Sequence, residues 1–250
     1  MGVLPVWIIL KQQVLRTAVL CLCSAIGLTA VLWAGHTARP ADPAFAPANG
    51  GPVVWVIDPG HGGEDGGAVS TGGVEESHVN LEVSLRLNEL LRFAGQRTVM
   101  TRREDVSVCD AGLDTIRARK ASDIRNRVAL VNETGGAVLV SIHQNSLPSS
   151  PETHGAQVFR NREEGGELLA ETIQNTLNEA INTHRAKEAR VIPKTIYLMN
   201  HVTAPAILVE CGFLSNGAEA ARLTESAYQT KLAAVITAGC LQALAGEDAP

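Results

Sequence analysis

Aromatic residues are scarce in this sequence, and acidic residues outnumber basic ones after residue 40. Phe, Trp and Tyr make up 4% of the 250 residues, too few for a surface that stacks nucleic-acid bases. Residues 1–40 carry Lys11, Arg16 and Arg39 and no acid, so 18 basic residues (21 − 3) face 26 acidic ones in the remainder, a balance of −8. Nucleic-acid binding normally needs a basic surface. We therefore expect no nucleic-acid partner.

Cysteine is also too rare to form a disulfide framework. Two of the five cysteines lie in an apolar N-terminal run, which leaves Cys109, Cys211 and Cys240. Three cysteines indicate free thiols or at most one disulfide bridge, and the sequence leaves both alternatives open.

The N-terminal segment has the pattern of an export signal. Lys11 and Arg16 precede an uncharged, mostly apolar run, Thr17–Gly35, and residues 36–50 are rich in Ala and Pro. This order predicts a signal peptide or signal anchor over residues 1–35, followed by a tether over residues 36–50. A buried core helix is the less favoured alternative, because the tether would separate it from any core. We expect an exported protein, either secreted or anchored to the membrane by its N-terminus.

The remaining body, residues 51–246, alternates between strand-like and helix-like patterns. Helical periodicity is present in four segments, residues 75–95, 115–136, 165–181 and 226–244. Strands are predicted in six segments, residues 53–58, 97–101, 137–143, 155–160, 195–200 and 206–213. Such alternation is typical of an α/β fold, and we expect a mainly parallel central sheet of about six strands with helices on both faces. Ligands of such sheets bind at the carboxyl ends of the strands.

Chemically useful side chains follow three of the predicted strands. His61 lies in a glycine-rich loop after the first, His143 ends "AVLVSIH", and Glu210 lies in "AILVECGF". Glu75 and Glu76 begin the first predicted helix of the body. Parallel strands would bring these residues to one edge of the sheet.

Two histidines and a glutamate are the ligands of a three-residue zinc site that leaves the fourth position to water. Zinc makes that water a nucleophile for an amide, and a further glutamate then serves as general base. Glu210 is the candidate base, because a carboxylate after "AILV" is costly to bury without a partner. The spacing also fits a structural metal or a phosphate loop, although the Gly-Lys-Ser/Thr ending of a P-loop is absent.

Four stretches carry a family resemblance, "VIDPGHGGEDGGA", "GGVEE", "SIHQNS" and "ILVECGFLSN". Across residues 53–246 the chain resembles the zinc-dependent N-acetylmuramoyl-L-alanine amidases of peptidoglycan (type 3). The resemblance implies that His61, Glu76 and His143 hold Zn²⁺ and that Glu210 is catalytic. It favours Glu76 over Glu75, because the family places its ligand three residues after a glycine, here Gly73.

The resemblance also implies the reaction and its setting. A zinc-activated water would hydrolyse the amide between N-acetylmuramic acid and L-alanine, with Asn145 as a candidate donor to the oxyanion. The partners would be glycan strands and stem peptides, together with a possible protein activator. "ASDIRNRVALVNE" and the segment after Glu210 resemble the germination-specific spore-cortex branch. That branch implies cortex modification, with formation of muramic lactam, in the developing spore.

Two other functions remain open from the residues. The chain could be a catalytically silent wall-binding or regulatory member of the same fold, which would be expected to lack a ligand or the base. It could instead be a zinc peptidase that cuts within the stem peptide. The new amino terminus in a peptidoglycan digest separates these functions.

Overall fold

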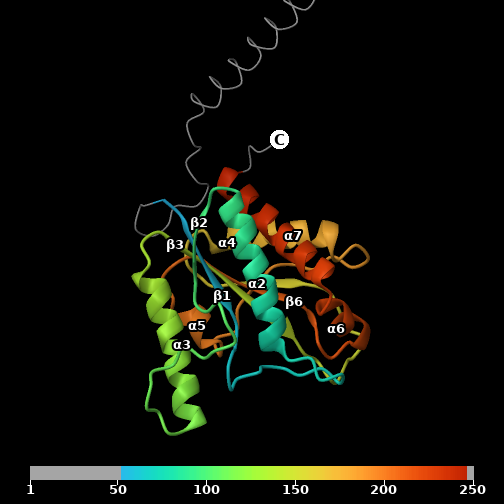
Figure 1. Cartoon of the computed structure of the whole chain (residues 1–250). Helices are drawn as coiled ribbons and strands as arrows, with labels where there is room; N and C mark the ends of the chain where they lie inside the picture. The colour runs from blue at the N-terminus through green and yellow to red at the C-terminus, as the bar shows by residue number, and fades with distance from the viewer. Residues whose placement is uncertain (1–51, 247–250) are drawn as a thin grey trace, which may run out of the picture. The chain divides into compact units, whose positions relative to one another are not determined.

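Strands and helices alternate throughout residues 52–246, the part of the chain that the computed structural model describes (Figure 1). In chain order the elements are β1 (Val54–Pro59), α2 (Glu76–Phe93), β2 (Arg97–Met100), α3 (Ile116–Glu133), β3 (Ala137–Asn145), β4 (Gln157–Arg160), α4 (Gly166–Ala180), β5 (Arg190–Val191), α5 (Tyr197–His201), β6 (Ala206–Phe213), α6 (Gly217–Leu223) and α7 (Ser226–Ala245). The predicted signal segment and tether lie outside the described residues. None of the described helices is long and apolar enough to cross a membrane.

The six strands form one sheet in the order β2-β1-β3-β6-β4-β5. The β1–β2, β1–β3 and β3–β6 pairs are parallel, β4 is antiparallel to β6, and β5 is parallel to β4. The apolar runs of β1, β3 and β6 form its centre, where strands are covered on both faces. The prediction of a mainly parallel sheet in an α/β fold is therefore confirmed.

Successive residues of the central strands alternate between two apolar cores. Trp55, Ile57 and Val140 pack into the core beneath α2, α4 and α7. Val56 and Leu139 pack into the core of the opposite face, which α3 and α5 cover. Figure 1 shows these two groups of helices on either side of the sheet. The metal ligands predicted from the sequence lie at its carboxyl edge.

One predicted strand, "TIYLMN", is wrong, because this segment contains the short helix α5. Leu198 and Met199 are buried in the second core while Tyr197 and Asn200 are exposed. Asn200 Nδ2 donates to the carbonyl of Ile196 at 2.6 Å, which supports the turn. Both edges of β6 are already paired, with β3 and β4, so the segment packs on a face of the sheet instead.

Two short elements were not predicted from the sequence. The two residues of β5, Arg190 and Val191, are both exposed and have no apolar pattern. The helix α6 has only 7 residues and begins after Asn216, whose side chain accepts from the N–H of Glu219 at 2.9 Å. The three cysteines of the body are free thiols, so the alternative of one disulfide is wrong within the described residues.

Candidate metal centre and catalytic site

The loop after β1 places His61 in a left-handed backbone conformation, with φ at 60°. This conformation costs a non-glycine residue about 1 kcal/mol or more. Two contacts hold it: Arg127 Nη2 donates to the carbonyl of His61 at 2.8 Å, and the N–H of Gly62 donates to the carbonyl of Asp65 at 2.8 Å. The loop therefore turns back on itself and directs the His61 ring toward β3.

Glycine is required in this loop for close packing around the two histidine rings. A Cβ atom at Gly60 would lie 2.2 Å from the His143 ring, and one at Gly67 would lie 2.6 Å from Glu76 Oε2. A side chain at either position would therefore push the His143 ring or the Glu76 carboxylate out of place. The glycine-rich stretch therefore lets three polar residues from separate elements meet.

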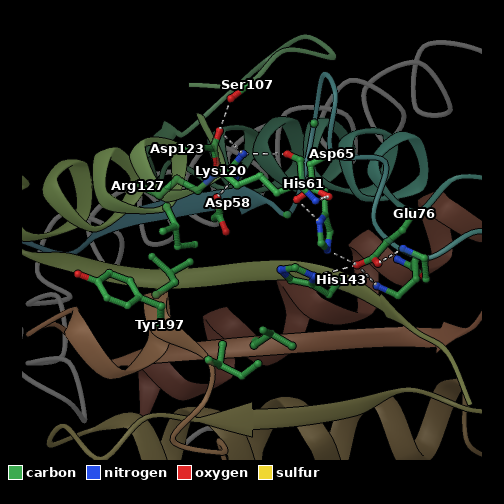
Figure 2. A pocket seen from close by; sticks show the side chains of 18 of the residues that line it. Asp58, His61, Asp65, Glu76, Ser107, Lys120, Asp123, Arg127, His143 and Tyr197 are labelled. Atoms are coloured by element: carbon green, nitrogen blue, oxygen red, sulfur yellow. Dashed lines mark hydrogen bonds and ion pairs between the residues drawn. The ribbon is translucent and has the colours of Figure 1, made fainter. Parts of the chain in front are cut away.

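His61, Glu76 and His143 each offer one ligand atom, and these atoms all lie within 4.8 Å of one another. Glu76 Oε1 is 3.4 Å from His61 Nε2 and 2.8 Å from His143 Nδ1, and the two ring centroids are 5.1 Å apart. Figure 2 shows the three side chains pointing toward one another from the β1 loop, α2 and β3. The structure thus brings together the predicted set, which can hold a metal ion.

Glu76 is fixed in place by its neighbours. Its Oε2 accepts from the N–H of Ala68 at 2.9 Å, and its Oε1 accepts from the N–H of Gln144 at 3.1 Å. Burial raises the pKa of this carboxyl, but hydrogen bonds and charges from His143 and His61 outweigh burial and hold the pKa well below its ordinary value. The carboxylate is therefore ionised, as a metal ligand must be. Glu75 is exposed and lies outside the group.

Glu210 lies on β6 directly opposite His143 on β3 and lines the same cavity. Its Oε2 atom is buried and has no hydrogen-bond partner within residues 52–246. Burial, with a smaller contribution from the negative charge of Glu76, raises the pKa of Glu210 to about 7 although His143 opposes this. A carboxyl with such a pKa can accept and return a proton near neutral pH.

The cavity has a volume of about 470 Å³ and extends over the sheet between α3 and α5. In Figure 2 Tyr197 lies toward the end of this cavity away from His143 and Glu76. The apolar lining of the cavity consists mainly of Ile116, Ile124, Ile196, Leu198 and Leu208. Asn145 also lines the cavity, and its Oδ1 accepts from the N–H of Ser146 at 2.8 Å.

Asp65 is a site residue that sequence reasoning missed. Its Oδ2 lies 2.9 Å from His61 Nδ1, and its Oδ1 accepts from Lys120 Nζ at 2.8 Å. Burial lowers the pKa of His61, but hydrogen bonds and charges from Asp65 and Glu76 outweigh burial and raise it to about 9. A carboxylate behind a ligating histidine fixes its tautomer and ring orientation. The only signal in the sequence is that Asp65 lies four residues after His61.

A buried ion pair supports the base of the loop. Arg127 Nη1 lies 2.5 Å from Asp58 Oδ1, and both side chains are almost fully buried. Arg127 also pairs with Asp123, and its Nη1 donates to the carbonyl of Pro59. Burial of Asp58 opposes ionisation, but Arg127 and the hydroxyls of Ser141 and Thr101 lower its pKa to about 2. The sequence pattern gave no indication of this network.

His78 does not join the metal group. It is exposed, and its Nε2 lies 3.0 Å from Asp105 Oδ2, outside the cluster of ligand atoms. Glu76, two residues earlier on α2, is buried whereas His78 is exposed.

Comparison with protein families gives a match over most of the described residues. Residues 56–242 match a family described as N-acetylmuramoyl-L-alanine amidase. The germination-specific N-acetylmuramoyl-L-alanine amidase of Bacillus subtilis (strain 168) is 37% identical over 192 residues, which cover 77% of this chain and 79% of that protein.

Solved structures of similar chains have the same fold. The CwlD amidase from Clostridioides difficile, in complex with the GerS lipoprotein, matches with a TM-score of 0.73 and 31% identity, covering 77% of this chain and 98% of that chain. The N-acetylmuramoyl-L-alanine amidase AmiC2 of Nostoc punctiforme matches with a TM-score of 0.63 and 31% identity, covering 76% and 96%.

Proposed function

The chain belongs to the N-acetylmuramoyl-L-alanine amidase family, and from this premise we propose that it hydrolyses peptidoglycan with a water activated by Zn²⁺. The bond cut is the amide between N-acetylmuramic acid and L-alanine. The observation that carries the proposal is the meeting of His61, Glu76 and His143, with ligand atoms within 4.8 Å of one another beside Glu210. Membership of this family supports cleavage of the same bond.

The donor set fits zinc. Two imidazole nitrogens and one carboxylate oxygen are ligands that zinc takes in hydrolytic enzymes, where a fourth position stays open. The unpartnered, buried Oε2 of Glu210 lies beside this group, and a buried carboxylate oxygen without a hydrogen bond calls for a polar partner. We assign His61, Glu76 and His143 as the ligands and keep Glu210 outside the set.

Zn²⁺, when bound, polarises the amide carbonyl and acidifies water at neutral pH. Glu210 then accepts the proton of the attacking water and donates it to the nitrogen of the leaving L-alanine. Burial raises the pKa of Glu210 and the charge of bound Zn²⁺ would lower it, and these opposing effects suit a group that accepts and returns a proton near neutral pH. Asn145 is our candidate donor to the developing oxyanion, because it lines the cavity. Its Oδ1 accepts from the Ser146 N–H, so its amide nitrogen is the group that would donate.

We further propose a role in the spore cortex, where removal of the peptide from muramic acid precedes formation of muramic lactam. The similarity to a germination-specific amidase supports this role. Residues 1–35 would direct export as a signal peptide or anchor, residues 36–50 would be a tether, and residues 51–246 would be the catalytic domain. The CwlD structure holds a lipoprotein partner, which supports the proposal that this chain also has a protein activator.

Digestion of purified cortex peptidoglycan tests the reaction. The expected products are a new L-alanine amino terminus and a glycan with peptide-free muramic acid, formed only with zinc present. A new amino terminus at another residue would identify a stem-peptide peptidase instead. Absence of any product, with zinc bound and the activator supplied, would favour the catalytically silent alternative. For the setting, unaltered cortex muropeptides in a strain without the gene would contradict the spore role.

A further inference from the structure

A second hollow, of about 250 Å³, lies apart from the metal group, and none of its lining residues lines the larger cavity. It forms where four segments meet: the loop before β4, the loop after α4, α6 and the beginning of α7. Figure 1 shows α6 beside the first turns of α7. Side chains from distant parts of the sequence are therefore gathered around one depression of the surface.

Five of the twelve residues that line this hollow are basic. They are His154, His184, Arg185, Arg222 and Lys231, and all five are exposed. Within residues 52–246, no carboxylate forms an ion pair with Arg185, Arg222 or Lys231. In a chain with an excess of acidic residues, three unpaired cations around one hollow form a local positive surface that attracts anions.

Glu219, the one acidic residue that lines this hollow, is hydrogen-bonded to backbone N–H groups. It is buried, and its carboxylate accepts from the N–H of Gly155 at 2.9 Å and from the N–H of Phe213 at 2.7 Å. These bonds join the start of the β4 segment to the end of β6. Because Glu210 lies three residues before Phe213 on the same strand, the hollow is built at the same edge of the sheet as the metal group.

The Tyr228 ring orients one of these cations. Its side chain lines the hollow and is only 7% exposed. The Arg222 guanidinium lies 4.3 Å from the centre of this ring. A cation–π contact therefore holds Arg222 at the hollow, while the Tyr228 hydroxyl oxygen is itself buried and does not face a ligand there.

We propose that this hollow binds a carboxylate of a stem peptide on the peptidoglycan strand, at a distance from the bond that is cut. This proposal rests on the proposed function, because it takes peptidoglycan as the polymer. Arg222 and Lys231 provide charged donors for the carboxylate. A second attachment on a repeating polymer raises the effective concentration of substrate at the metal group.

Sedimentation with insoluble peptidoglycan, freed of phosphate-bearing wall polymers, tests the site. Arg222→Ala combined with Lys231→Ala is expected to weaken binding roughly threefold to tenfold at low salt, the range for two exposed charge contacts. The difference should disappear near ~0.5 M salt, where surface charges are screened. Arg92→Ala combined with Lys194→Ala is the matched control, because both residues are exposed, unpaired among the described residues and outside the hollow. Equal binding by the two double variants overturns the proposal.

Untreated wall is the second arm of the experiment. A loss of binding confined to wall that retains phosphate polymers would assign the hollow to phosphate and overturn the carboxylate assignment. Hydrolysis of a small soluble muramoyl peptide should be unchanged in Arg222→Ala combined with Lys231→Ala. If the unmodified protein fails to cut this soluble substrate, the proposed amidase function fails, while the sedimentation result still decides whether the hollow binds the polymer.

Discussion

Glu210 and His143 are direct register partners on the adjacent parallel strands β6 and β3. Side chains at paired positions of neighbouring strands lie on the same face of the sheet. The base proposed from the sequence is therefore adjacent to a proposed metal ligand, although 67 residues (210 − 143) separate them along the chain. This pairing makes the division of roles between the two residues testable.

Glu210→Gln keeps the shape of the side chain and removes its basicity. We expect the variant to retain zinc and to lose about a hundredfold or more of its turnover, the usual effect of losing an acid–base group. Metal analysis and the rate on a soluble muramoyl peptide measure the two properties separately. Loss of zinc would make Glu210 a ligand, and near-normal turnover would place the base elsewhere.

The ligand assignment predicts a different pattern for the histidines. His61→Ala and His143→Ala should each strip zinc from the protein, because two remaining ligands hold the ion weakly. His78→Ala is the control, since His78 is exposed and contacts Asp105 instead of the metal group. Inductively coupled plasma analysis of the purified variants gives the zinc content. Full occupancy in either His61→Ala or His143→Ala would remove that residue from the ligand set.

Much of this site could be predicted because the sequence marks the ends of strands clearly. His61, His143 and Glu210 each follow or lie in a long apolar run, and parallel strands bring such ends to one edge. The choice of Glu76 over Glu75 as the ligand rested only on the spacing that the family has after a glycine, here Gly73. The structure places Glu76 within the group and leaves Glu75 exposed.

Other features depend on contacts that no local pattern reports. The pairing of Asp58 with Arg127 joins residues 69 positions apart. The segment containing Tyr197 has the apolar composition of a strand, but both edges of β6 are occupied by β3 and β4. Tertiary structure therefore decides the conformation of this segment against its propensity.

Asp65 is predicted to strengthen zinc binding through His61. In Asp65→Asn the negative charge behind the imidazole is lost, so we expect zinc affinity to fall by about tenfold to a hundredfold, the usual effect of losing a partner of a ligating histidine. Competition with a chromophoric chelator measures the affinity. Glu64→Gln is the control, because Glu64 lies in the same loop and pairs with Arg119 on α3 at 2.7 Å without contacting His61. Wild-type affinity in Asp65→Asn would contradict the prediction.

Asp58 is predicted to make the stability of the fold depend on pH in the acid range. Its pKa is about 2 in the folded protein against an ordinary value of 3.8, so the folded state favours the ionised form. The stabilisation, about 2 kcal/mol in full, is present above pH ~4 and is lost as the pH falls toward ~2.

Asp58→Asn tests this dependence by removing the titrating group. At pH 7 we expect the variant to be less stable by about 3 kcal/mol, because it weakens a buried ion pair with Arg127. By pH 3 its deficit relative to the unmodified protein should shrink by about 1 kcal/mol, because Asp58 of the unmodified protein has by then lost part of its advantage. Urea unfolding at several pH values gives both numbers, with the exposed Asp114→Asn as control. A deficit that stays constant from pH 7 to pH 3 would show that the ion pair with Arg127 does not depress the pKa of Asp58.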